Sequence, residues 1–175
     1  NTGWGWDDVL PYFIKAENQE RGKNEFHGIG GPLSVSDQRI QLPLLNEFQN
    51  AAEEFGIPKT KDFNTGNNPG CGYFQVTEKD GFRCSTSVGY LNPIKKRQNL
   101  KTITNAHVKK INFKGKTAVG IEYWLGDELK KLTCNNEIIL SSGSIGSPQI
   151  LQTSGIGNSQ KLKDLGIDVV QELKG

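Results

Sequence analysis

The chain has 175 residues, of which 21 are basic and 19 acidic, so its formal net charge of +2 is close to balance. This balance argues against a nucleic-acid-binding protein, which usually concentrates basic residues on one surface. Hydrophobic residues make up 34% of the chain, and 21 glycines with 7 prolines predict many turns. No apolar run approaches the length of a membrane span.

Cysteines and histidines are too few and too dispersed to predict a metal site. Cys71, Cys84 and Cys134 form no close ligand spacing, and only two histidines accompany them. An odd cysteine count argues against a complete disulfide framework, so we expect three reduced thiols in a reducing compartment. That favours a cytoplasmic location and leaves open a peripheral membrane association. Because the chain has no Met and starts at Asn1, we interpret it as an internal segment of a longer polypeptide.

The first forty residues predict a helix followed by a loop and a short strand. Asp7 and Asp8 can cap the helix that follows them and favour its positive end, and the apolar face of that helix is formed by Val9, Leu10, Phe13, Ile14 and Ala16. Residues 17–28 are polar and predict a surface loop. The alternating pattern of residues 33–36 predicts a strand.

The middle of the chain combines one helix with long connections. An apolar stripe predicts a helix over residues 43–55, with Pro43 at its start and Gly56 at its end. Residues 59–72 predict a loop, and residues 73–77 a strand. Asp80 and Gly81 are typical of a hairpin turn.

From residue 99 the pattern becomes that of β structure. We expect a meander of three to four strands, separated by turns at Gly115 and Gly126; the candidate strands are residues 100–104, 107–113, 116–124 and 128–133. A short helix over residues 160–165 and a strand over residues 167–170 follow near the end.

Residues 137–157 predict a strand, a turn of small residues and a short helix. The apolar run 138–140 indicates a buried strand, and Pro148 suits the first position of the helix. Glycine and serine allow a backbone to approach a ligand closely, and helix N–H groups attract electron-rich groups. Small-residue turns are nevertheless common in α/β proteins, so a purely structural role is an equal alternative on this pattern alone.

Five segments resemble the glucose–methanol–choline (GMC) flavin oxidoreductases, in order and over essentially the whole chain. The most specific is G-S-x-x-S-P-x-I-L-x-x-S-G-I-G at residues 143–157, which is similar to a signature of that family. The others are W-G-W-D-D-V-L-P-Y-F at 4–13, H-G-x-x-G-P-L at 27–33, R-C-S-T-S-x-x-Y-L-x-P at 83–93, and V-x-x-I-x-F-x-G-x-x-A-x-G-I-E-Y at 108–123. Within the family, the resemblance is nearest to choline dehydrogenases and aliphatic alcohol dehydrogenases.

The resemblance implies a mixed α/β fold that combines parts of two domains. Residues 1–41 would belong to an antiparallel-sheet substrate domain, and residues 42–175 to a Rossmann-like FAD-binding domain that contains the meander. It also implies oxidation of a small alcohol by hydride transfer to FAD, with oxygen, a quinone or another molecule as the electron acceptor.

The resemblance assigns cofactor contacts to four residues. The family's meander valine, whose backbone contacts the adenine part of FAD, corresponds to Val108, although a strand valine is more often only a core residue. Ser142, Gly143 and Ser147 form the close-approach turn and are the next candidates for FAD binding.

The chain departs from the family pattern in two respects. It contains no G-x-G-x-x-G, the loop that holds a dinucleotide pyrophosphate. No residue can be assigned as catalytic: His27 lies in a glycine-rich loop that it is expected to order, and His107 begins a strand. The family's catalytic histidine belongs to a part of the fold beyond Gly175. Trp4, Trp6 and Trp124 are too scattered to predict an aromatic cage and are interpreted as packing residues.

Two alternatives to an alcohol dehydrogenase or oxidase stay open. One is a hydroxynitrile lyase of the same family, in which the flavin performs no redox chemistry. The other is a non-catalytic module that retains the fold.

Overall fold

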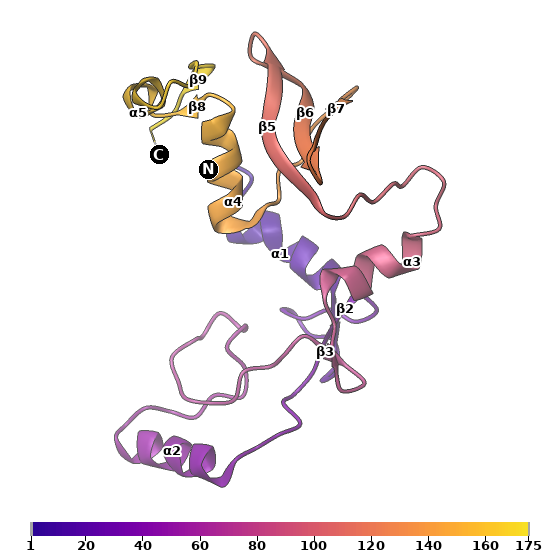
Figure 1. Cartoon of the computed structure of the whole chain (residues 1–175). Coiled ribbons are helices and arrows are strands. Elements are labelled where there is room, and N and C mark those ends of the chain that lie inside the picture. Colours follow the sequence, from indigo (N-terminus) through magenta and orange to yellow (C-terminus); the bar gives the residue numbers. More distant parts are fainter. Residues whose placement is uncertain (1, 175) are drawn as a thin grey trace. The chain divides into compact units, whose positions relative to one another are not determined.

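The computed structural model describes residues 2–174, which divide into two compact units (Figure 1). The first unit extends to Lys101 and the second begins at Thr102. Both helices and strands are present, which confirms the mixed α/β class. The predicted boundary after Gln41 concerns the domains of the family; it falls inside the first unit and stays a prediction.

The N-terminus of helix α1 (Trp6–Ala16) is capped by contacts between Gly5 and Asp8. Gly5 is extended before the helix, and its N–H donates to Asp8 Oδ2 at 3.0 Å. Asp7 and Asp8 in the first turn and Lys15 in the last turn complement the helix dipole. The chain leaves the helix at Glu17 in an extended conformation.

Strands β1 (Glu17–Gln19) and β2 (Leu33–Val35) pair in parallel. The prediction of a loop over residues 17–28 was therefore wrong for its first three residues, because β1 follows α1 without a connecting loop and pairs with β2. Two glycines allow the connection to pack against the end of α1. A Cβ on Gly28 would lie 1.8 Å from the carbonyl oxygen of Ile14, and one on Gly31 would lie 2.5 Å from that of Ala16.

Helix α2 (Pro43–Glu54) is confirmed, with Pro43 at its first position. Gly56 follows it with a φ of +96°, the left-handed conformation that glycine accepts most readily. The predicted apolar stripe is present, but none of its residues is buried: Leu44 is 78% exposed and Phe48 65% exposed.

The remainder of the first unit contains little regular structure. The prediction of a strand over residues 73–77 was wrong. Within that range only Val76 pairs with another segment, through an isolated bridge to Ser36. The predicted hairpin is confirmed: β3 (Glu78–Lys79) and β4 (Phe82–Arg83) pair antiparallel around Asp80 and Gly81, both with positive φ. A π-helical turn (Ser87–Leu91) leads into α3 (Asn92–Ile94).

The second unit is built on the predicted antiparallel meander. Its strands β5 (Ala106–Lys114), β6 (Thr117–Leu125) and β7 (Glu128–Thr133) lie in the order β5–β6–β7. The strand predicted over residues 100–104 was wrong. Asn105, with a φ of +54°, breaks the extended backbone just before β5.

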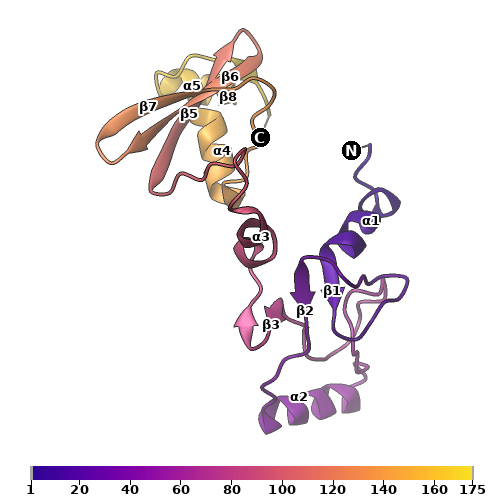
Figure 2. The same ribbon diagram turned by 90° about the vertical axis from the view of Figure 1, so that its right-hand side faces the viewer.

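Helix α4 (Gly143–Thr153) lies alongside the meander (Figure 2). It begins five residues before Pro148, so the prediction that Pro148 opens the helix was wrong. The apolar run 138–140 does not join a ladder, because its carbonyls and N–H groups find no strand partner among the described residues. After α4, β8 (Ile156–Gly157) pairs in parallel with β9 (Gln171–Glu172), and α5 (Ser159–Asp164) connects them. The last strand thus lies beyond the predicted residues 167–170.

The core of the second unit is small. Ile111 and Tyr123 are buried in the meander, and Leu162 of α5 is 1% exposed. Beside this core lies a buried charge: Glu122 is only 7% exposed, and its carboxylate contacts Lys131 Nζ at 3.0 Å and Lys109 Nζ at 3.8 Å. The contact with Lys131, reinforced by nearby lysine charges, lowers the pKa of Glu122.

The lowered pKa of Glu122 predicts that the meander loses stability in acid. Since the folded state binds this proton less readily than the unfolded state, the contribution is present above the ordinary glutamate pKa and disappears as pH falls through the folded value. We expect Glu122→Gln to lower the thermal midpoint at neutral pH, with the difference from wild type vanishing toward pH 3.

Thermal unfolding of both proteins over this pH range tests the expectation. Glu128→Gln is the matched control, because Glu128 also pairs with a lysine but its side chain is 71% exposed, where screening leaves little energy to lose. A Glu122→Gln difference that grows as the pH falls would contradict the assignment.

The close packing of the loop against α1 gives a second prediction. Gly28→Ala places a methyl group against the Ile14 carbonyl, and we expect it to lower the free energy of unfolding by about 3 kcal/mol, the upper end of overpacking costs. Ile29→Ala in the same loop is the control, since Ile29 is 58% exposed and surface changes typically stay within about 0.5 kcal/mol. Equal effects in urea unfolding would rule out the backbone contact as the reason for glycine.

Candidate functional site

All four residues predicted to contact a cofactor lie in the second unit. Val108 is a half-buried residue of β5, and Ser142, Gly143 and Ser147 surround the start of α4. Ser142 and Ser147 are brought together, since the Ser142 N–H donates to Ser147 Oγ at 2.9 Å. Val108 shares no hydrogen bond with this turn in the described residues.

The start of α4 leaves backbone N–H groups free. Ser142 forms no side-chain cap, and no acidic residue occupies the first turn. Gly143 has a φ of +82° with open space around it, so its conformation, rather than crowding, requires glycine. An eleven-residue helix with uncapped and exposed first N–H groups presents donors to an electron-rich group.

The opposite end of α4 is fixed to the meander by two hydroxyl groups. Ser154 Oγ accepts from the Ile111 N–H at 2.8 Å, and Thr153 Oγ donates to the Lys109 carbonyl at 3.1 Å. Ser154 is 7% exposed. These contacts occupy the edge of β5 that faces away from β6, directly after Val108.

The ladder between β5 and β6 changes register at the same point. Val108 pairs with Tyr123, but the next paired residue is Lys110, opposite Glu122. Such a bulge redirects backbone groups and is common beside binding sites. The backbone around Val108 is therefore less completely used by the sheet than that of a regular strand.

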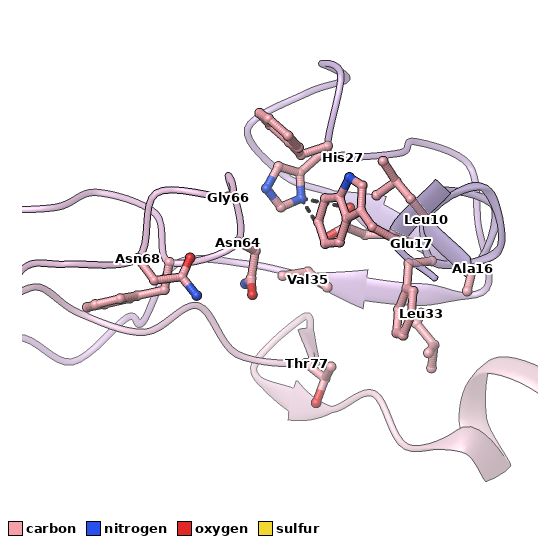
Figure 3. Close-up of a pocket in the computed structure, with 14 residues that line it drawn as sticks. Leu10, Ala16, Glu17, His27, Leu33, Val35, Asn64, Gly66, Asn68 and Thr77 are labelled. Atoms are coloured by element: carbon pink, nitrogen blue, oxygen red, sulfur yellow. Dashed lines mark hydrogen bonds and ion pairs between the residues drawn. The ribbon is translucent and has the colours of Figure 1, made fainter. Parts of the chain in front are cut away.

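A second candidate site, which the sequence did not predict, is a cavity of about 430 Å³ in the first unit (Figure 3). Side chains from α1, β1, β2, the 26–27 loop and residues 63–77 line it, and most of them are apolar or aromatic. Trp6 and Phe26 face each other with ring centroids 6.5 Å apart. Asn64, Asn68 and Thr77 add uncharged polar groups.

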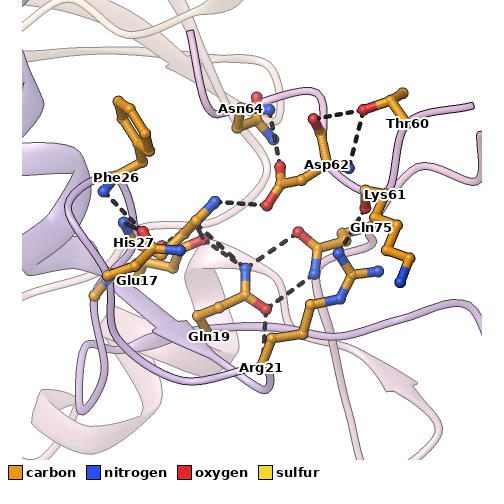
Figure 4. A network of polar contacts seen from close by, with 12 residues as sticks. Glu17, Gln19, Arg21, Phe26, His27, Thr60, Lys61, Asp62, Asn64 and Gln75 are labelled. Carbon is orange, nitrogen blue, oxygen red and sulfur yellow. Dashed lines mark hydrogen bonds and ion pairs between the residues drawn. The ribbon is translucent and has the colours of Figure 1, made fainter. Parts of the chain in front are cut away.

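The polar side of this cavity is organised by His27, which is 3% exposed. Its Nδ1 lies 2.8 Å from Glu17 Oε2, and its Nε2 lies 2.9 Å from Asp62 Oδ2 (Figure 4). Gln19, 4% exposed, exchanges two hydrogen bonds with Gln75 behind it. Glu17 also accepts from the Gly28 N–H, so the His27 ring and the backbone of its loop share one partner; that His27 orders the loop stays a prediction.

Sequence patterns could not reveal the partners of His27. Glu17 precedes it by ten residues and Asp62 follows it by thirty-five, so no local spacing connects the three. Trp6 likewise finds Phe26 only through the fold. Among residues 2–174, no group of three or more His, Cys, Asp or Glu is placed to hold a metal ion.

None of the helices within residues 2–174 has the length and apolar character needed to cross a membrane.

Comparison with known proteins extends the resemblance seen in the sequence. An oxygen-dependent choline dehydrogenase of Vibrio vulnificus is 43% identical over 152 residues, which are 86% of this chain and 27% of that protein. An FAD-dependent oxidoreductase of Chaetomium thermophilum superposes with a TM-score of 0.89 at 30% identity, covering 99% of this chain and 32% of that one. The pyridoxine 4-oxidase described from Mesorbium loti has a TM-score of 0.89 at 27% identity, covering 98% and 34%.

The chain thus spans about a third or less of the length of these relatives. The sequence profile of the GMC oxidoreductases matches residues 1–173, nearly the whole chain. The chain belongs to the GMC oxidoreductase family.

Proposed function

We propose that the protein carrying this chain oxidises a small alcohol, choline-like or aliphatic, with FAD as its cofactor. The observation that carries the proposal is the family match over residues 1–173. It is supported by the choline dehydrogenase from Vibrio vulnificus and by the FAD-dependent oxidoreductase from Chaetomium thermophilum. When bound, FAD supplies the acceptor for the hydride that leaves the alcohol carbon.

The start of α4 fits an electron-rich part of the cofactor. Its N–H groups are uncapped, and the left-handed Gly143 turns the backbone without placing a side chain over them. Ser147 holds the turn by accepting from Ser142. In the proposal, Ser142, Gly143 and Ser147 contact FAD through this backbone, as at other helix N-termini that bind anions.

Val108 is the proposed contact for the adenine part of FAD. A backbone contact makes no demand on the side chain, which agrees with a half-buried valine in a strand. The register change after Val108 supports the proposal, because a bulge re-aims backbone donors and acceptors. The docking of α4 at Lys109 and Ile111 fixes this part of β5.

In the proposal the chain contributes one wall of the cofactor site, and neither of its two histidines is assigned a proton transfer. Both ring nitrogens of His27 are already bound to carboxylates, so neither is free to accept a substrate proton. His107 is exposed on β5, and no acid or base faces it among the described interactions. The proposal also includes an electron acceptor that takes the electrons from reduced FAD, which is oxygen, a quinone or another molecule.

Of the two alternatives, the lyase receives no support. The relatives described above carry oxidoreductase names, and none is a hydroxynitrile lyase. A non-catalytic module would be favoured if the protein carrying this chain lacked both the dinucleotide fingerprint and the family's catalytic histidine pair.

The proposal predicts that alcohol reduces the flavin of the protein that carries this chain. Anaerobic addition of choline or of a primary aliphatic alcohol should bleach the flavin absorbance, because two electrons pass from the alcohol to FAD. Absorbance spectroscopy in a sealed cuvette measures this, with tertiary butanol as a control that has no transferable hydrogen on its carbinol carbon. Cyanide release from a cyanohydrin with an unbleached flavin would instead establish the lyase.

The 175-residue chain by itself should bind FAD only weakly. It has no G-x-G-x-x-G to hold the pyrophosphate, so the contacts at α4 and Val108 act alone. Expressed and purified in isolation, it should be colourless. A yellow preparation with one flavin per chain would show that this segment contains a sufficient cofactor site.

A further inference from the structure

His27 has a carboxylate on each ring nitrogen, and the proposed function does not use it. Glu17 Oε2 lies 2.8 Å from Nδ1 and Asp62 Oδ2 lies 2.9 Å from Nε2. The His27 side chain is 4% exposed, while those of Glu17 and Asp62 are 16% and 18% exposed. The imidazole is thus almost fully buried between two carboxylates that are each partly exposed.

Hydrogen bonds hold the Glu17, His27 and Asp62 side chains together. Each ring nitrogen lies within hydrogen-bond distance of one carboxylate oxygen, so the imidazole links the Glu17 side chain to that of Asp62. The remaining carboxylate lone pairs have donors of their own: Glu17 accepts from the Gly28 N–H at 3.0 Å and Asp62 from the Asn64 N–H at 2.9 Å. Each of the three side chains is therefore held by more than one hydrogen bond.

Asp62 belongs to a segment, residues 60–64, that has few other attachments to the strands. Thr60 Oγ bonds the backbone of Asp62, which closes a local turn. Arg21 donates to the Lys61 carbonyl at 2.6 Å from the far side. Among the hydrogen bonds of the described residues, His27 thus supplies one of two side-chain links between this segment and the β1–β2 region.

The 60–64 segment supplies part of the cavity wall. Phe63 and Asn64 both line the cavity, and Phe63 stacks on Phe74 with centroids 4.5 Å apart. Because Asn64 is bonded directly to the Asp62 side chain, a shift of Asp62 moves the wall. The volume of about 430 Å³ falls within the range of small-molecule sites, and its lining is mainly apolar, with a few uncharged polar groups beside Glu17 and His27.

We propose that His27 is a positioning residue of this cavity. Through Asp62 it holds residues 60–64, so that Phe63 and Asn64 contact the carbon skeleton of the substrate. The identification of the occupant as an alcohol rests on the proposed function; the positioning of the segment by His27 does not.

Hydrogen exchange in the FAD-loaded protein tests the positioning directly. In His27→Ala, the backbone amides of residues 60–64 should exchange about tenfold faster or more. This corresponds to about a tenfold increase in the equilibrium constant for local opening of the segment. His27→Gln keeps a donor for only one carboxylate and should show the same direction of change. His107→Gln, at the other histidine of the chain, is the control and should leave this segment unchanged.

Unchanged exchange of residues 60–64 in both His27 variants would overturn the proposal. If His27→Ala does not fold, His27→Gln alone decides the comparison.

A double-mutant cycle tests whether His27 acts through Asp62. His27→Ala and Asp62→Ala should each raise the KM for the alcohol about tenfold while kcat stays within about threefold, because binding changes and the reacting atoms do not. The double variant should match either single variant, since each removes the same link. A hundredfold rise in the double variant, or a loss confined to kcat, would contradict the proposal.

The proposed function and the positioning role of His27 can be refuted independently. If no alcohol reduces the wild-type flavin, the proposed function is wrong, and the hydrogen-exchange comparison still decides the role of His27. If the flavin is reduced but the variants leave exchange and KM unchanged, the function stands and the positioning role is wrong.

Discussion

Two hydroxyl groups at the end of α4 determine how the second unit is assembled. An edge strand leaves alternate backbone groups unpaired, and on β5 the Ile111 N–H and the Lys109 carbonyl are met by Ser154 and Thr153. This fixes a helix across the strand that carries Val108. The signature at residues 143–157 thus contains both the uncapped start and the anchored end of one element, which accounts for the small polar residues at its two ends.

The first unit depends on polar contacts rather than on an apolar core. Among its described residues only Cys84 is a buried hydrophobic side chain, whereas Gln19, His27 and Ser36 are buried and polar. A buried polar network is stabilising only when its members are satisfied, and the network around His27 meets that condition through carboxylate, amide and backbone partners. Its geometry therefore has little freedom, which suits a unit that must hold a cavity open.

Local pattern predicted the elements that local chemistry decides. The stripe of α2, the turn at Asp80 and the three meander strands follow from residue spacing and glycine conformation. The errors occur where partners distant in sequence decide. Residues 138–140 look like a strand but find no neighbour, residues 17–19 look like a loop but pair with β2, and Pro148 lies inside a helix that Gly143 begins. The cavity was missed for the same reason, because Asp62 approaches His27 only in three dimensions.

The two units offer different chemistry to a ligand. The second presents backbone: uncapped N–H groups at α4 and a bulged strand at Val108, neither of which depends on a particular side chain. The first presents side chains: aromatic rings, amides and the carboxylate of Glu17, which lies 2.8 Å from His27 Nδ1. Backbone donors suit a cofactor that every member of a family shares, whereas side chains change readily between members. Selection for a new substrate would therefore be expected to alter the cavity around Phe63 and Asn64 before it altered the turn at Gly143.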